Sequence, residues 1–176
     1  MLKMEKNKTR IYIDGANLHQ GMKSKDSSLD YEKFYKYLAN KYHPEVIYIF
    51  IGKMEKHKFL YNFLKECGYK IIFKETYQNQ AGEIKGNVDA EIVLTTVQEF
   101  YEKNYNCGVL VSGDGDFSCL IDFWKNKKIT PKILAPKKKN CSYFLKNKNV
   151  SLTFLDDKRL NPKIIKPKSE KAPDND

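Results

Sequence analysis

Short apolar runs separated by helix-spaced segments make up most of the chain. Apolar residues at spacings of three and four predict helices between the runs, because that spacing lines one helical face. Strands that alternate with helices are typical of a mainly parallel sheet, because each right-handed crossover returns the chain in the same direction. The pattern therefore predicts one α/β domain. The expected strands are 10–13, 46–51, 69–73, 107–111, 130–134 and 150–155, and the expected helices are 31–38, 56–67, 88–103, 117–124 and a short piece near 142–146.

The two ends of the chain and one internal segment lie outside this pattern. Residues 1–9 are polar and rich in lysine, and the domain is expected to span 10–157. Beyond residue 157 the periodicity is lost while Pro and Lys accumulate, so 158–176 are predicted to form a flexible basic tail. The polar segment 74–87 contains two glycines and is too long for a tight turn, which is typical of loops that carry function.

Carboxylates follow two of the predicted strands. Asp14 closes the first strand, and Asp114 and Asp116 come just after the strand at 107–111. In a parallel sheet the carboxyl ends of the strands share one edge, and ligands bind there where the strand order reverses. If these two strands flank that point, the carboxylates meet. Each segment alone also fits an ordinary turn or a solvated loop, so their joint occurrence is what favours a site.

A cluster of carboxylates implies a bound cation. Close carboxylates repel one another unless some are protonated or a cation lies among them. An all-oxygen set with no suitably spaced Cys or His is typical of Mg²⁺ or Mn²⁺. Such a centre supports phosphodiester hydrolysis, because it activates a water and neutralises charge on the phosphoryl oxygens. Asn17 follows Asp14 by three residues, so a helical turn there would direct it toward that carboxylate or a phosphate.

The charge balance points to a polyanionic partner. The chain has 32 basic and 22 acidic residues, a formal charge of +10, which suits nucleic acid or an anionic membrane surface. Charge alone does not choose between them. Candidates to line a groove for RNA are Lys85 and the lysines at 137–139. Tyr77 is a candidate to stack on a base, and His19 is a candidate to reach a substrate. A solvated face is the alternative interpretation of the lysine run.

Several other classes of protein are disfavoured. The four cysteines lack paired spacing, and there is neither a signal-peptide segment nor an apolar run of ~20 residues, so a cytoplasmic protein with reduced thiols and no membrane span is expected. The three histidines have no nucleophile elbow nearby. A phosphatase is disfavoured because Asp14-Gly15-Ala16 lacks the Asp-x-Asp pattern. We expect no organic cofactor, and the sequence leaves the oligomeric state open, a homo-oligomer included.

Three blocks of the sequence resemble a known family. Residues 11–17, 85–89 and 109–117 are similar, in order and spacing, to the signature of NYN domains of the LabA-like group, within the PIN-like ribonuclease superfamily. The likeness runs from about Arg10 to Leu155, and its most specific part is the block at 109–117. It implies a three-layer αβα sandwich with a mainly parallel central sheet of strand order 3-2-1-4-5 and a possible extra edge strand.

The resemblance also implies a function. It implies a metal-dependent endoribonuclease that uses Mg²⁺ or Mn²⁺ and acts on RNA. By motif position, the catalytic and metal-binding residues are Asp14, Asp89, Asp114 and Asp116, and the residues expected to contact substrate are Asn17, Ser112 and Lys85.

One position departs from the family pattern. Members commonly carry another Asp in the helix that starts near Asp89, where this chain has Thr95. Thr cannot supply the charge that attracts a second cation, although its hydroxyl can hydrogen-bond a metal-bound water. Glu91 is a poor substitute, because it lies about 200° around the helix from Asp89. The alternative hypothesis is therefore a catalytically weak or inactive module that binds RNA or a protein partner.

Overall fold

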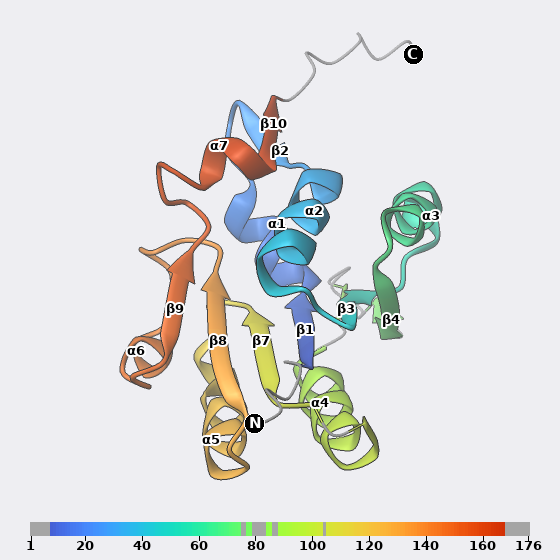
Figure 1. Ribbon diagram of the computed structural model, residues 1–176. Helices are drawn as coiled ribbons and strands as arrows, with labels where there is room; N and C mark the ends of the chain where they lie inside the picture. The colour runs from blue at the N-terminus through green and yellow to red at the C-terminus, as the bar shows by residue number, and fades with distance from the viewer. Residues whose placement is uncertain (1–7, 75–76, 79–83, 86–87, 104, 168–176) are drawn as a thin grey trace, which may run out of the picture.

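One six-stranded parallel sheet forms the centre of the molecule. The computed structural model describes residues 8–74, 77–78, 84–85, 88–103 and 105–167 (Figure 1). The sheet has the order β4-β3-β1-β7-β8-β9, and every neighbouring pair is parallel. This is the predicted order 3-2-1-4-5 with the sixth strand added at the edge, so the predicted fold class is confirmed. The strands are β1 (Thr9–Asp14), β3 (Val46–Gly52), β4 (Lys70–Lys74), β7 (Cys107–Val111), β8 (Thr130–Ala135) and β9 (Ser151–Phe154).

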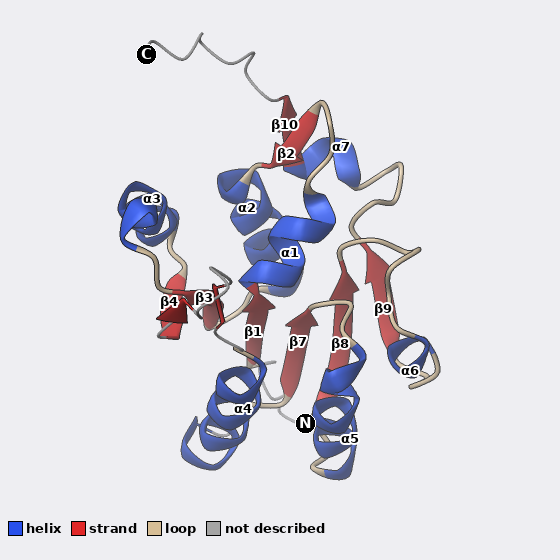
Figure 2. Cartoon of the chain, turned by 180° about the vertical axis from the view of Figure 1, so that it is seen from behind, coloured by secondary structure: helices blue, strands red, loops and turns tan. Residues whose placement is uncertain are grey.

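Helices cover both faces of the sheet and complete a three-layer sandwich (Figures 1 and 2). One face packs against α1 (Gly15–Met22), α2 (Tyr31–Tyr42) and α3 (Lys58–Cys67), and the other against α4 (Asp89–Lys103), α5 (Ser118–Asn126) and α6 (Tyr143–Lys146). The remaining elements are the 3-10 turns η1 (Glu55–His57) and η2 (Gly115–Phe117), helix α7 (Asn161–Ile164), and two antiparallel pairs, β2 (Ser27–Leu29) with β10 (Ile165–Pro167) and β5 (Tyr77–Gln78) with β6 (Ile84–Lys85).

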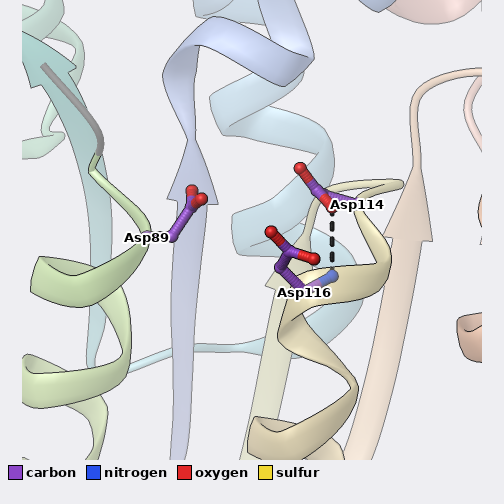
Figure 3. Close-up of side chains that lie close together, drawn as sticks. All are labelled: Asp89, Asp114 and Asp116. Carbon is purple, nitrogen blue, oxygen red and sulfur yellow. Dashed lines mark hydrogen bonds between the residues drawn. The ribbon is translucent and has the colours of Figure 1, made fainter. Parts of the chain in front are cut away.

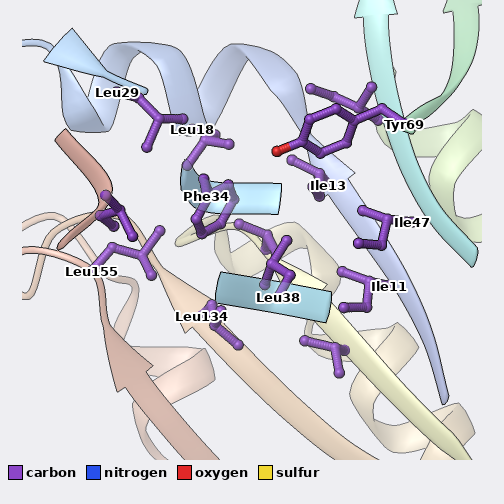
Figure 4. Close-up of a cluster of buried hydrophobic side chains, with 14 of the residues drawn as sticks. Ile11, Ile13, Leu18, Leu29, Phe34, Leu38, Ile47, Tyr69, Leu134 and Leu155 are labelled. Atoms are coloured by element: carbon purple, nitrogen blue, oxygen red, sulfur yellow. The ribbon is translucent and has the colours of Figure 1, made fainter. Parts of the chain in front are cut away.

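Each face of the sheet has its own hydrophobic core, because side chains alternate sides along a strand. Ile11 and Ile13 of β1 lie in one core with Leu38 of α2 (Figure 4). Tyr12, between them, lies in the other core beside the ring of Trp124. All residues of β1 and of β7 are buried. Central strands covered on both faces are expected to read as the near-continuous apolar runs seen in the sequence.

The indole of Trp124 lies directly against β7. It is fully buried, and its Nε1 donates a hydrogen bond to the hydroxyl of Tyr105 at 2.8 Å. A Cβ on Gly108 would lie 2.5 Å from Cε2 of the indole, so any larger residue at position 108 would displace the ring. Glycine at position 108 thereby sets how closely α5 approaches the sheet.

A buried ion pair holds α4 against the amino end of β1. The guanidinium of Arg10 donates to the carboxylate of Glu99, which also accepts a hydrogen bond from the hydroxyl of Tyr48 at 2.8 Å. Asp89 lies about 15 Å along the helix from Glu99. Asp14 lies about 13 Å along the strand from Arg10. The distance from Glu99 to Asp89 along α4 is close to the distance from Arg10 to Asp14 along β1. The ion pair at the amino end of β1 therefore places Asp89 near the carboxyl end of that strand.

Among the described residues, no helix is both long enough and apolar enough to cross a bilayer. Cys67, Cys107, Cys119 and Cys141 are all free thiols.

Two stretches contain structure that the pattern did not predict. Residues 15–22 form helix α1, where the sequence indicated only a turn around Asp14 and Asn17. The polar segment 74–87, expected to be a loop, contains the short strands β5 and β6. Helix α1 is short and buries only two large side chains, Leu18 and Met22, so its periodic signal is weak.

The prediction of a flexible tail from residue 158 is wrong for residues 158–167. This stretch forms α7 and β10, and β10 pairs with β2 so that Ile165 lies opposite Leu29. Ile164 is fully buried in the same core as the α2 side chains, and Leu160 packs against that core. Isolated apolar residues among Pro and Lys carry no periodicity, so only their contacts with distant elements reveal the structure. Residues 168–176 lie outside the described part of the chain.

Replacing Ile164 by Ala is expected to destabilise the protein by about 2–4 kcal/mol, because the change leaves a cavity in a core that surrounds the side chain completely. Chemical denaturation followed by circular dichroism measures the change. Lys166→Ala, an exposed position in the adjoining strand β10, is the matched control and should alter the free energy of unfolding by less than about 0.5 kcal/mol. Equal stabilities of the two variants would contradict the docking of this segment.

Candidate functional site

The strand order reverses between β1 and β7, and side chains from both strand ends meet at their carboxyl edge. The register pairs Ile13 with Val111, which brings the next residues, Asp14 and Ser112, beside each other. The hydroxyl of Ser112 donates to Asp14 Oδ2 at 3.3 Å. Asp14 Oδ1 accepts from the backbone N–H of Asn17 at 3.0 Å, so the same carboxylate caps helix α1.

The turn after β7 is tied to α1 by polar contacts. Asn17 Oδ1 accepts from the backbone N–H of Gly113 at 2.9 Å. The hydroxyl of Ser112 accepts from the N–H of Asp114 at 3.1 Å. The carboxylate of Asp114 in turn accepts from the N–H of Asp116 at 3.0 Å and caps the turn η2. Ser112 and Asn17 therefore fix the two acidic segments relative to each other, and their expected contacts with substrate stay predictions.

Three carboxylates converge at this edge from two elements. Asp89, in the first turn of α4, and Asp114 and Asp116, around η2, each place a carboxylate oxygen within 4.8 Å of the others (Figure 3). Asp89 and Asp114 are half-buried, and Asp116 is exposed. In the part of the chain that the structure describes, no other group of three His, Cys, Asp or Glu side chains comes this close.

Asp14 is buried, and the negative charges of Asp89 and Asp114 affect the pKa of its carboxyl. Only 5% of Asp14 is exposed, and this burial raises the pKa of its carboxyl above the ordinary value. The negative charges of Asp89 and Asp114 raise the pKa further, whereas the hydrogen bonds from Asn17 and Ser112 lower it. Charging the Asp14 carboxyl beside Asp89 and Asp114 is therefore unfavourable without a counter-ion.

The donor set fits a hard divalent cation. Every candidate ligand is a carboxylate oxygen, which suits Mg²⁺ or Mn²⁺ and disfavours Zn²⁺, whose sites use Cys or His. The spacing of the oxygens allows one ion to lie between Asp89, Asp114 and Asp116. A cation there would also relieve the repulsion on Asp14.

The other residues singled out in the sequence lie in different positions. Thr95 is half-buried on α4, about 9 Å along the helix axis from Asp89, so its expected contact with a metal-bound water stays a prediction. Glu91 pairs with Lys74 at 2.7 Å, which agrees with its being a poor ligand. His19 is exposed on α1. Lys85 and Tyr77 lie in the pair β5 and β6, and their side chains are outside the described part of the structure.

A polar pocket beside the cluster was not predicted. It has a volume of about 230 Å³ and is lined by Asn17, Gln20, Gly21, Gly113, Pro136, Lys137 and Asn140. Asn17, Gln20 and Gly21 are spaced by three and four residues, so they line one face once α1 is recognised as a helix. That spacing is the signal which would have found the pocket. Lys137 belongs to the lysine run that the sequence offered as a groove for RNA.

Replacing Asp14 by Asn is expected to raise the thermal stability of the protein in EDTA at pH 7. Asn keeps the oxygen that accepts from Asn17 but removes the buried charge. Because the pKa of Asp14 is raised in the folded state, the native protein binds the proton more tightly and loses stability as the pH rises above about 4. The gain from the substitution should therefore vanish below about pH 4, with each recovered kcal/mol raising Tm by about 2–4 °C.

Thermal melts from pH 3.5 to 8 in EDTA measure this effect. Asp26→Asn is the matched control, since Asp26 is exposed in the turn before β2 and the same change there should leave Tm nearly unaltered. A wild-type protein as stable as Asp14→Asn at pH 7 would show that the buried charge has no cost.

Comparisons with known proteins agree with this architecture. The solved structure of a protein of unknown function from Vibrio parahaemolyticus matches with a TM-score of 0.76 and 20% identity, and the match covers 94% of this chain and 100% of that chain. At this identity the likeness shows the fold alone. No curated protein matches the sequence. The family described as NYN domain matches residues 8–156, a span that holds the sheet and all four acidic residues of the site. The chain therefore belongs to the NYN domain family.

Proposed function

We propose that this protein is a metal-dependent endoribonuclease that hydrolyses RNA phosphodiester bonds at the cluster of Asp14, Asp89, Asp114 and Asp116 with Mg²⁺ or Mn²⁺. The observation that carries the proposal is the approach of Asp89, Asp114 and Asp116 to within 4.8 Å at the reversal point of the sheet. Membership of the NYN domain family supports it, and ligands of open parallel sheets bind at this edge, where the strand order reverses.

The four carboxyl groups have different tasks in this proposal. Asp89, Asp114 and Asp116 would hold the cation, which when bound orients a water and neutralises charge on the phosphoryl oxygens. Asp14 is too buried to contact RNA directly. Its carboxylate would add negative charge to the metal site, and its hydrogen bond with Ser112 fixes the turn that carries Asp114. Asp116 is exposed, so its carboxylate could hold a cation where solvent and the scissile phosphate would reach that cation.

The charge of the protein supports RNA as the substrate. The formal charge of +10 attracts a polyanion, and Lys137 lines the pocket next to the acidic cluster. A lysine that neutralises an RNA phosphate here would offset the repulsion between the acidic cluster and the RNA.

We also propose a cytoplasmic location, because all four thiols are free and such thiols persist in reducing compartments.

Wild-type protein is expected to cleave a labelled single-stranded RNA in Mn²⁺ or Mg²⁺ and to lose this activity in EDTA. Asp114→Asn should lower the rate by about 100-fold or more, because Asn keeps the oxygen that caps η2 but removes charge from the metal site. Asp26→Asn, far from the cluster in sequence and exposed, is the control and should cleave at the wild-type rate. Equal cleavage by Asp114→Asn and wild type would remove the acidic cluster from the mechanism.

The departure at Thr95 favours a second candidate, a weak or inactive module that binds RNA or a protein partner. If the missing carboxylate limits catalysis, Thr95→Asp should increase metal-dependent cleavage by about tenfold or more, with Thr95→Asn as the uncharged control. Gel-based cleavage assays at several Mn²⁺ concentrations measure the effect. RNA binding without cleavage in wild type and in Thr95→Asp would favour the binding module.

A further inference from the structure

The pocket beside the acidic cluster has walls from three separate elements. Asn17, Gln20 and Gly21 come from α1, Gly113 from the turn after β7, and Pro136, Lys137 and Asn140 from the loop after β8. Its volume of about 230 Å³ is smaller than the roughly 300–1,000 Å³ of pockets that enclose drug-sized ligands. The size suits part of one nucleotide rather than a large cofactor.

The walls of this pocket are fixed before any ligand arrives. Helix α1 touches the loop after β8, since a Cβ on Gly21 would lie 2.3 Å from Cβ of Pro136. The N–H of Lys138 donates to both carboxylate oxygens of Asp156, at 3.1 and 3.2 Å. The N–H of Ser142 donates to the carbonyl oxygen of Gly113 at 2.9 Å. A preformed pocket loses little conformational entropy when it binds a ligand.

The pocket shares two chain segments with the acidic site. Gly113, which lines it, directly precedes Asp114. Asn17 lines it as well, while its backbone N–H donates to the carboxylate of Asp14. A group bound in the pocket would therefore contact the same two segments that carry Asp14 and Asp114.

The chemistry of the lining selects the ligand. The amides of Gln20 and Asn140 each offer donors and an acceptor, the combination that pairs with the polar edge of a base. Asn17 uses its amide oxygen on the N–H of Gly113, and in the described part of the chain its amide NH₂ has no partner, so that group remains able to donate. Lys137 supplies a cation suited to a phosphate.

We propose that this pocket holds the RNA nucleotide that flanks the scissile phosphate, with Gln20 and Asn140 reading its base and Lys137 contacting a neighbouring phosphate. This inference rests on the proposed ribonuclease function and extends it to sequence preference. Single-stranded RNA fits best, because the base must leave its stack to present an edge to these amides.

The test maps cleavage sites in a random-sequence single-stranded RNA with Mn²⁺. Wild type should show a preferred base at one position next to the cut. The double variant Gln20→Ala with Asn140→Ala should reduce that preference by about tenfold, since a good amide pair to a base contributes that much discrimination. Lys137→Ala should slow cleavage of all sequences alike.

Matched controls are Gln98→Ala and Lys65→Ala, which change exposed residues on α4 and α3 and should leave both the preference and the rate as in wild type. An unchanged base preference in the double variant, or a wild type that cuts all sequences equally, would overturn the assignment of the pocket.

Binding separates this inference from the proposed function. Fluorescence anisotropy in EDTA measures the affinity of the same proteins for a labelled ten-nucleotide RNA under conditions where no metal-dependent cleavage occurs. One outcome is that the pocket variants bind RNA more weakly than their controls while wild type does not cleave. That result would refute the nuclease and retain an RNA-binding pocket. Cleavage by wild type with binding unchanged in the pocket variants would refute the pocket alone.

Discussion

The parallel register of β1 and β7 is the constraint on which the site depends. With Ile13 opposite Val111, the first residue beyond each pair is Asp14 on one strand and Ser112 on the other. Their hydrogen bond joins the two strand ends, and Ser112 then holds the turn that presents Asp114. A slip of one residue would turn these side chains to the opposite face and separate the carboxyl groups.

The segment that carries Asp89, the first turn of α4, is positioned by a contact at the opposite end of that helix. Helix α4 runs along β1 with Glu99 paired to Arg10 at the amino end of the strand. That buried pair leaves Asp89 near the opposite end. Removing Arg10 would leave the buried Glu99 carboxylate without its cation, which makes the arrangement costly to break, whereas Arg10 has a second partner in Glu45 at 3.2 Å. The geometry of the acidic cluster therefore depends on contacts remote from it.

The site gathers carboxylates whose negative charges repel one another at the carboxyl edge of the sheet. Burial and the neighbouring carboxylates raise the pKa of Asp14, so the folded protein is less stable when this group is charged. The hydrogen bonds from Asn17 and Ser112 offset part of that cost. A hard cation among the carboxylates would offset more, which links the stability of this edge of the sheet to the proposed chemistry.

The sequence by itself determined the sheet and the acidic residues, since strands buried on both faces must be apolar throughout and β7 was predicted at its observed bounds, 107–111. The alternating pattern placed Asp14, Asp114 and Asp116 at strand ends, whereas the strand order and the role of Asp89 followed from the family resemblance. Only the tertiary structure decided that α1 is a helix with a pocket beside it, and that Ile164 belongs to the core. Both depend on contacts between segments far apart in the chain, which no local periodicity records.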